Sequence, residues 1–323
     1  MSDDIAPDRN LALEAVRATE AAAIAAARFL GGGDERAADQ AAVSAMHRAI
    51  EKFQVDGTVR IGEGDARDGK LFVGQKVGTG TGPQADVALV AIEGTSIVAR
   101  GGYNALSVLA MAEEGGFLTV PEIYMDKIAV GPNVASEAID LDKSPGENLE
   151  AVADCMGVAV SDLQVCLLDR PRHGQLITAV RETGARIQLI MDGDVNGAVA
   201  PGLANSPVDV YMGIGGAPQG VLAAAALRAL GGAMQGRLVI RSADDRAKAG
   251  DAGIEDTDKK LTLEEMAGGH VTLAATGITQ GPMLNGVRLA PEGAVTHSMV
   301  MRSRTGTFRY IEGHHDFRRS RKD

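Results

Sequence analysis

The sequence predicts an α/β protein in which helices cover mixed, partly parallel sheets, and three observations indicate this class. From Leu163 onward, apolar strand-like runs alternate with amphipathic segments, which is typical of βα units. Residues 9–53 are instead rich in Ala and Glu, which favours long helices. Between these parts lie short runs of Val, Ile, Leu and Ala that favour buried strands.

The N-terminal part is expected to begin with two helices. Asn10 can cap the first, and three glycines from Gly31 to Gly33 can end it. Apolar residues at helical spacing mark one face of the second. The expected elements, in order, are helices over 9–33 and 39–53, strands over 58–64 and 85–94, a helix over 103–116, strands over 117–120 and 123–132, and a capped helix over 144–157.

The pattern of residues changes near Pro145, where the C-terminal part begins. Its strand runs are apolar almost throughout, and this favours strands that are covered on both faces. The expected elements, in order, are a strand over 163–171, a helix over 173–185, strands over 186–194 and 208–216, a helix over 217–232, and strands over 270–279 and 297–315.

Composition narrows the function classes. The net charge of −11 argues against a general nucleic-acid binder, which needs a basic face. No run of about 18 apolar residues is present, so we expect no membrane span. The two cysteines form no disulfide framework, and the N-terminus is acidic without an apolar core. We therefore expect a cytoplasmic protein.

Carboxylates stand beside glycines at several expected element ends. Asp39 follows a glycine-rich stop, Glu63 lies between two glycines, Glu93 precedes Gly94, and Asp192 and Asp194 flank another glycine. Hard cations such as Mg²⁺ bind through a few carboxylates together with water and substrate phosphate. A single acid in a glycine turn is more often ordinary turn chemistry. The prediction therefore depends on several of these acids meeting in one pocket.

Two further segments suit phosphate. Arg170 and Arg172 follow an expected strand, and arginine pairs bidentately with phosphate oxygens. The alternative is two surface arginines without a ligand. The glycine-rich segment 213–220 leads into a helix, whose first N–H groups can bind an anion. Its spacing fits neither a dinucleotide fingerprint nor a P-loop.

These motifs together resemble the class II fructose-1,6-bisphosphatases of the GlpX type, within the lithium-sensitive phosphatase superfamily. The resemblance runs from "RNLALEAVRATEAAA" through "VRIGEG", "IEGT", "YMDKIAVGP", "DRPRH", "DGD" and "GIGGAP" to "VMRSRTGTFRYIE". It implies the αβαβα layered fold of the fructose-bisphosphatase and inositol-monophosphatase type. It also implies dependence on Mg²⁺ or Mn²⁺, removal of the 1-phosphate of fructose 1,6-bisphosphate, activity on sedoheptulose 1,7-bisphosphate in some relatives, and a homodimer or homotetramer.

The resemblance assigns roles to particular positions. Asp39, Glu63 and Glu93 match the metal ligands, and Thr95 with Asp39 matches the pair that activates the attacking water. Glu93, Gly94 and Thr95 match the residues that hold the scissile phosphate. The remaining sugar and distal-phosphate contacts match Tyr124, Arg170, Pro171, Arg172, Asp192, Gly193, Asp194 and Gly216. We therefore expect a metal-site α+β subdomain over 1–160 and an α/β sugar- and phosphate-binding subdomain over 161–323, closely packed as one unit.

The chain departs from the family pattern at two expected metal ligands. Val90 stands where the family has Asp, and Gln219 stands where it has Glu. The loop after Glu63 is also altered, and Asp65 or Asp68 in it is the better candidate for a replacement ligand. Two hypotheses follow: a working bisphosphatase with a reduced metal set and weakened activity, or a catalytically inactive homologue that binds a phosphosugar or serves a regulatory role.

Overall fold

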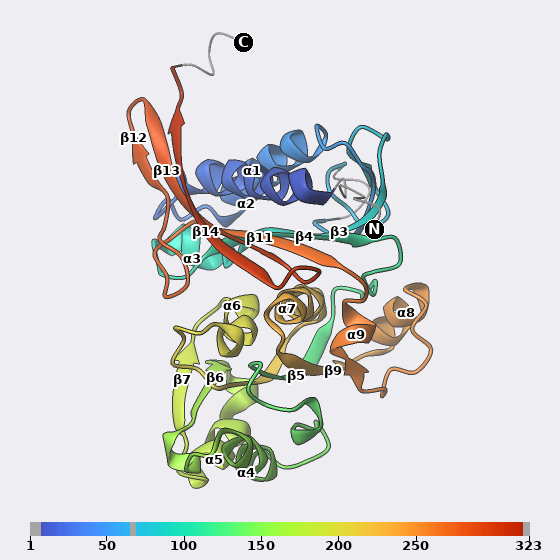
Figure 1. The fold of residues 1–323 in the computed structure, drawn as a ribbon, viewed down its shortest axis with the longest axis vertical. Coiled ribbons are helices and arrows are strands. Elements are labelled where there is room, and N and C mark those ends of the chain that lie inside the picture. Colours follow the sequence, from blue (N-terminus) through green and yellow to red (C-terminus); the bar gives the residue numbers. More distant parts are fainter. Residues whose placement is uncertain (1–7, 65–68, 319–323) are drawn as a thin grey trace, which may run out of the picture. The chain divides into compact units, whose positions relative to one another are not determined.

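The computed structural model describes residues 8–64 and 69–318, and the chain divides into two compact units (Figure 1). The first comprises residues 1–115 and 270–323, and the second comprises residues 116–269. The division expected near residue 160 falls inside the second unit. The reason is long-range strand pairing, since Val271–Gly277 pairs with Leu106–Glu113 and returns the C-terminal strands to the N-terminal sheet.

The first unit is built on a mixed sheet with strand order β12-β13-β11-β4-β3-β1-β2, and β14 pairs with β13. The β1–β3 pair is parallel, and the other recorded neighbours are antiparallel. Its elements are α1 (Asp8–Ala27), α2 (Glu35–Ile50), β1 (Asp56–Ile61), β2 (Lys76–Val77), β3 (Gln84–Glu93), α3 (Thr95–Arg100), β4 (Leu106–Glu113), β11 (Val271–Gly277), β12 (Arg288–Ala290), β13 (Gly293–Arg302) and β14 (Thr307–Asp316).

Helices α1 and α2 pack against each other and against this sheet (Figure 1). The buried side of α1 is almost entirely alanine, which lets the helix axis approach the strands closely where aromatic residues are scarce. A buried hydroxyl ladder runs beneath it: Thr19 Oγ1 lies 2.7 Å from Thr276 Oγ1, which lies 2.8 Å from Ser298 Oγ. These bonds satisfy polar groups that burial would otherwise penalise.

The helix expected over 103–116 is wrong, because Leu106–Glu113 is strand β4. The segment is rich in Ala, Leu and Met, which favour helix locally. However, β4 pairs with β3 on one side and β11 on the other, and seven of its eight residues are buried. A short apolar run of this kind is ambiguous between strand and buried helix, and the tertiary pairing decides it.

The second unit contains a sheet with strand order β10-β9-β5-β8-β6-β7. The β6–β7 and β6–β8 pairs are parallel, as expected for βα units, and β5 is antiparallel to both β8 and β9. Its elements are β5 (Tyr124–Val130), η1 (Ser136–Ala138), α4 (Pro145–Met156), η2 (Val160–Asp162), β6 (Gln164–Leu168), η3 (Pro171–His173), α5 (Gly174–Glu182), β7 (Arg186–Ile190), α6 (Asp194–Val199), η4 (Ala200–Gly202), β8 (Val210–Gly216), α7 (Ala217–Leu230), β9 (Ala233–Val239), α8 (Ala243–Asp251), β10 (Leu261–Thr262) and α9 (Leu263–Met266).

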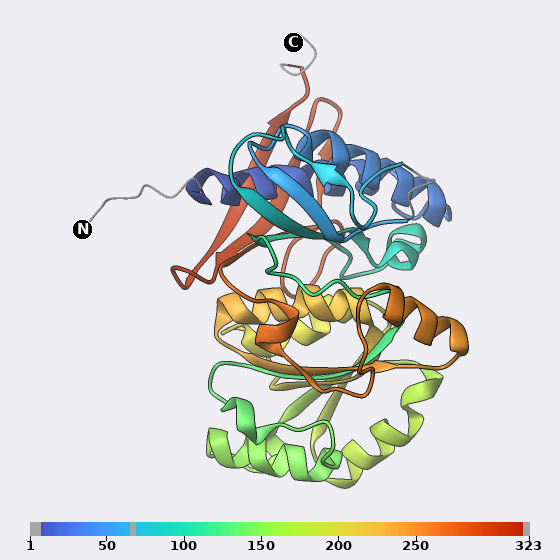
Figure 2. The same cartoon turned by 90° about the vertical axis from the view of Figure 1, so that its right-hand side faces the viewer.

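Helices lie on both faces of this second sheet, with α4 and α5 on one side and α6 and α7 on the other (Figure 2). Strand alternation explains the division: Met212 joins the apolar cluster under α4 and α5, while its neighbour Tyr211 packs against Gly197 of α6. The expected capped helix over 144–157 is confirmed, and Ser144 forms a capping box with Glu147.

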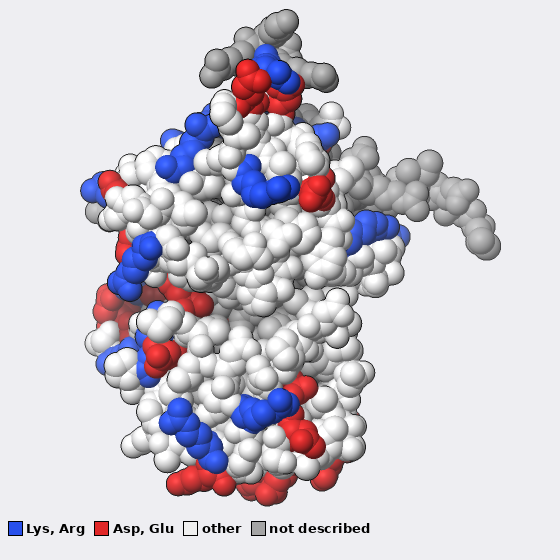
Figure 3. Space-filling model, turned by 90° about the vertical axis from the view of Figure 1, so that its left-hand side faces the viewer, with Lys and Arg blue, Asp and Glu red and all other residues white. Residues whose placement is uncertain are grey.

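Both units therefore combine mixed sheets with helices, and the α/β layered class is confirmed. Within residues 8–64 and 69–318, no helix has both the length and the apolar character that a membrane crossing requires. On the face drawn in Figure 3, lysines and arginines are interspersed with acidic residues on the surface of each unit.

Candidate active site

Asp39 and Glu63, which are 24 positions apart in the sequence, line one cavity of the first unit. The cavity has a volume of about 360 Å³. Arg36, Ser44 and Lys70 also line it, so the described part of its lining includes two acidic and two basic side chains. The structure thus brings together two of the three acids that the sequence predicts as metal ligands.

Asp39 reaches this cavity from the second turn of α2. The helix begins early because Asp34 caps it, with its Oδ1 accepting a 2.9 Å hydrogen bond from the Ala37 N–H. Burial raises the pKa of the Asp39 carboxyl, because the charged form loses hydration. A cation or a nearby basic group in the cavity would offset that penalty.

Glu63 is fixed by backbone contacts on both sides. Its N–H donates to the Leu71 carbonyl at 2.8 Å, and a Cβ on the preceding Gly62 would meet that same carbonyl oxygen at 2.0 Å. The Glu63 carboxylate accepts a 2.7 Å hydrogen bond from the Ala91 N–H of β3. Glycine at position 62 is therefore required by close packing, and Glu63 is held beside the end of β3.

Glu93 is positioned differently from the other two acids. The β3–β4 register shifts between Val90 and Glu93, and Glu93 is only 5% exposed. Gly94 follows in the left-handed region with φ 94°, and α3 begins at Thr95. Glu93 does not line the cavity that contains Asp39 and Glu63, although α3 packs against α2.

Val90 puts an alkyl side chain where the family pattern expects a carboxylate. It is 7% exposed, lies opposite Val108 of β4, and directly precedes the residue whose N–H holds Glu63.

Asp65 and Asp68, the alternative ligands, lie outside the described residues. In residues 8–64 and 69–318, no cluster of three or more His, Cys, Asp or Glu side chains is suited to hold a metal ion. Asp39 and Glu63 offer the carboxylate oxygens that a hard cation binds, with water and substrate oxygens as its other ligands.

In the second unit, the segment after β6 forms a tight turn around His173. The ring Nδ1 donates to the Leu168 carbonyl at 2.7 Å, and Nε2 accepts from the Ile214 N–H at 2.8 Å. Burial lowers the pKa of His173. The neutral ring thus links η3 to β8.

Arg172 and Tyr124 lie together at the surface of this unit. The Arg172 guanidinium donates twice to the Ile214 carbonyl, at 3.0 and 2.7 Å, and lies 4.8 Å from the Tyr124 ring centre. Arg241 lies over the same ring at 4.1 Å. Arg241 was not predicted from the sequence, because strand β9, which ends just before it, was not predicted either. A basic residue directly after a strand would have indicated it.

The glycines of segment 213–216 make room for neighbouring side chains. A Cβ on Gly215 would meet the Asp194 carboxylate at 2.0 Å, and a Cβ on Gly216 would meet Gln219 Oε1 at 1.8 Å. Gln219 therefore folds back over the start of α7. Internal packing accounts for Gly215 and Gly216 in this structure, and the anion site expected at this segment stays a prediction.

Lys127 is a residue that the sequence reading did not single out, although a lysine inside an apolar strand is a clear signal. Its ammonium group is fully buried and contacts the Asp194 carboxylate, while it also donates to the Gly216 carbonyl at 2.8 Å. Tyr211 donates its hydroxyl to the other oxygen of Asp194. Burial, with the negative charge of Asp194, raises the pKa of Cys166 to about 12.

The other expected contacts lie at the ends of β6 and β7. Pro171 is exposed at the first position of η3, and Arg170 precedes it with a 3.2 Å bond to the Asp169 carbonyl. Asp192 accepts a hydrogen bond from the Gly193 N–H at 3.0 Å, and Gly193 is left-handed with φ 88°.

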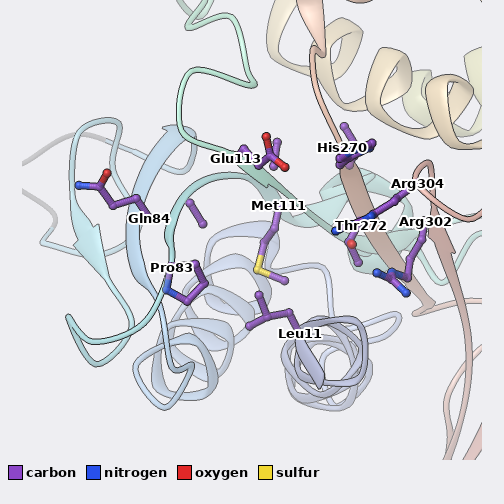
Figure 4. A pocket seen from close by; sticks show the side chains of 12 residues that line it. Leu11, Pro83, Gln84, Met111, Glu113, His270, Thr272, Arg302 and Arg304 are labelled. Carbon is purple, nitrogen blue, oxygen red and sulfur yellow. The ribbon is translucent and has the colours of Figure 1, made fainter. Parts of the chain in front are cut away.

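A second cavity of the first unit, with a volume of about 190 Å³, lies near the first turns of α1 (Figure 4). Its walls include the apolar side chains of Leu11 and Met111. Among the described residues, Glu113 is the carboxylate that lines it, together with His270, Arg302 and Arg304. One carboxylate in basic surroundings does not make a hard-cation site, so this cavity is a poorer candidate for phosphate ester hydrolysis.

Comparison with known proteins yields consistent matches over almost the whole chain. A family model described as bacterial fructose-1,6-bisphosphatase, glpX-encoded, matches residues 9–315. A protein of Trichodesmium erythraeum named D-fructose 1,6-bisphosphatase class 2/sedoheptulose 1,7-bisphosphatase is 41% identical, with 96% of this chain and 97% of the relative covered. A Synechococcus protein of the same name is also 41% identical, over 95% and 96% of the two chains.

Proposed function

We propose, on the premise that the chain belongs to the glpX-encoded bacterial fructose-1,6-bisphosphatase family of phosphatases, that it hydrolyses the 1-phosphate of fructose 1,6-bisphosphate. We extend the proposal to sedoheptulose 1,7-bisphosphate, which the names of the relatives also include. The observation that carries it is the family match over residues 9–315. In the reaction, water attacks phosphorus, the ester P–O bond breaks, and fructose 6-phosphate and inorganic phosphate leave.

Residues of the first unit would perform the chemistry. Asp39 and Glu63 would hold the cation, Mg²⁺ or Mn²⁺, with Glu93 as the third acid of the family set. Such a cation acts as a Lewis acid that neutralises charge on the phosphoryl group. Asp39 and Thr95 would orient the attacking water, and the Asp39 carboxylate would accept its proton.

The phosphoryl group would bind at the turn formed by Glu93, Gly94 and Thr95. Gly94 turns the chain sharply between β3 and α3, which leaves backbone N–H groups at the start of the helix. The register shift before Glu93 supports this role, because it changes the direction of the strand just where the turn begins.

Residues of the second unit would bind the sugar and the distal phosphate. Arg172 and Tyr124 are partly exposed and are held by fixed contacts, and Arg170 and Pro171 precede them in the same turn. Asp194 is buried with Lys127, so we assign it to holding Gly216 and the start of α7 in place. Asp192, Gly193 and Gly216 would then contact the ligand from the neighbouring strand ends.

The runner-up is a catalytically inactive homologue that binds a phosphosugar or has a regulatory role. Val90 and Gln219 favour this reading, because the alkyl group offers no ligand and the amide lacks the charge of a carboxylate. Binding of fructose 1,6-bisphosphate without turnover at any Mn²⁺ concentration would support it.

The test is phosphate release from fructose 1,6-bisphosphate across a series of Mn²⁺ and Mg²⁺ concentrations. We expect turnover that needs high metal, and we expect Asp39→Asn to lower kcat by about 10²–10³-fold, the usual effect of losing a group that stabilises the transition state. Without metal, the Asp39→Asn protein should unfold at the same temperature as the wild-type protein or at a higher one, because the asparagine side chain has no charge to bury. Wild-type protein that binds the substrate but releases no phosphate would overturn the proposal.

The proposal includes an assembly state and a location. We propose that the chain forms a homodimer or homotetramer and acts in the cytoplasm on a small soluble sugar bisphosphate. Sedimentation of the purified protein at micromolar concentration tests the first point, and a monomer there would contradict it.

A further inference from the structure

The acid cavity of the first unit contains basic side chains that the family pattern does not explain. Arg36 enters it from the first turn of α2, and Lys70 enters it from the segment after the altered loop. A cavity devoted to cations alone would present oxygens, and a basic group inside it repels a cation. Arg36 and Lys70 can offset part of the burial penalty of Asp39, and they can also attract an anion into the cavity.

Lys70 is held in place by a neutral partner. Its ammonium donates a 2.8 Å hydrogen bond to the Ser44 hydroxyl on α2. Among residues 8–64 and 69–318 the recorded partner of this ammonium is an uncharged hydroxyl, whereas the lysines at positions 76, 248 and 259 pair with carboxylates elsewhere on the surface. Lys70 is exposed and lines the cavity, so its positive charge can meet an anion that enters there.

The position of Val90 supplies the second argument. Val90 directly precedes Ala91, whose N–H holds Glu63, so in the part of the chain that the structure describes an alkyl group stands there where the family pattern expects a carboxylate. With an alkyl group in place of that acid, the described residues can bind less positive charge as metal ions. A phosphoryl group carries close to two negative charges and needs compensation from some source.

We propose that Lys70, assisted by Arg36, binds the phosphoryl oxygens of the substrate and supplies positive charge that the missing carboxylate can no longer recruit as a metal ion. This inference rests on the proposed function, since it names residues of the same site. It assigns Lys70 to substrate contact and Ser44 to positioning Lys70.

The proposal predicts opposite effects on cation and anion binding. Replacing Lys70 with Met removes a repulsive charge, so Mn²⁺ alone should bind about fivefold more tightly. The same change should weaken binding of inorganic phosphate and raise KM for fructose 1,6-bisphosphate by about tenfold. A residue that merely supports the fold would weaken both kinds of binding together.

Calorimetric titrations of purified protein with Mn²⁺ and, separately, with inorganic phosphate measure both effects. Lys52→Met is the matched control, because Lys52 is exposed and lies away from this cavity, and it should change neither affinity. Lys70→Arg keeps the charge and should leave Mn²⁺ affinity unchanged. Ser44→Ala keeps the Lys70 ammonium but removes the hydroxyl that positions it. This variant should raise KM about threefold without strengthening Mn²⁺ binding.

Two outcomes would overturn the proposal. Unchanged phosphate affinity in Lys70→Met excludes a phosphoryl contact, and a loss of Mn²⁺ affinity shows that the side chain supports the metal site. If the wild-type protein releases no phosphate from the sugar bisphosphate, the proposed function fails by itself, and the Mn²⁺ and phosphate titrations still decide the role of Lys70.

Discussion

The two units differ in how their expected site residues are used by the protein itself. In the first unit, Asp39 and Glu63 line an open cavity together with Lys70. In the second unit, Asp194 is buried in contacts with Lys127 and Tyr211. The difference teaches that matching a family motif locates a position but does not tell whether its side chain faces a ligand or supports the structure.

The largest expected effect tests the supporting role in the second unit. Lys127→Met should lower the free energy of unfolding by about 3–5 kcal/mol, because it leaves the Asp194 carboxylate buried without its cation. Chemical denaturation measures this change. Lys127→Met combined with Asp194→Asn should recover most of the loss, and a single variant that loses less than about 1 kcal/mol would show that Asp194 is not a structural residue.

The next effect sharpens the comparison from the side of the first unit. Val90→Asp restores a carboxylate near the residue that holds Glu63, so the Mn²⁺ concentration that gives half-maximal activity should fall by about tenfold. The free energy of unfolding of the metal-free variant should fall by about 1–3 kcal/mol, because the new acid is buried. Phosphate release and thermal unfolding, each with and without Mn²⁺, measure the two changes.

Leu89→Asp is the matched control for that variant. Leu89 precedes Val90 on β3 and is also buried, but strand alternation places it on the other face of the sheet, so the substitution should destabilise the protein without improving its use of Mn²⁺. Equal responses of the two variants to metal would show that position 90 does not lie next to a cation site.

The smallest effect concerns pH and the second unit. Burial lowers the pKa of His173 in the folded protein, so the unfolded chain binds a proton more readily. Stability from this residue is therefore full above its unfolded pKa of about 6.5 and falls as pH drops below that value, by at most about 1.4 kcal/mol per pH unit. Tm measured between pH 7.5 and 5.5 should fall less steeply in His173→Gln, and parallel curves would contradict this account.

The sequence predicted most of the local structure. The capping pattern around Ser144 specifies α4, and the apolar run of β3 specifies a buried strand, because short-range steric and hydrogen-bonding preferences decide both. The order of motifs also specified the family. The acids Asp39 and Glu63 were identified as neighbours from that resemblance, and they do line one cavity.

Tertiary structure alone decided the rest, because pairing between distant segments leaves no local trace. It made Leu106–Glu113 a strand by placing it between β3 and β11, and it returned β11 to β14 to the first unit. It also brought Lys70 beside Asp39 and buried Asp194 against Lys127. Local propensity acts over a few residues, whereas charge and burial at a site depend on every segment that packs around it.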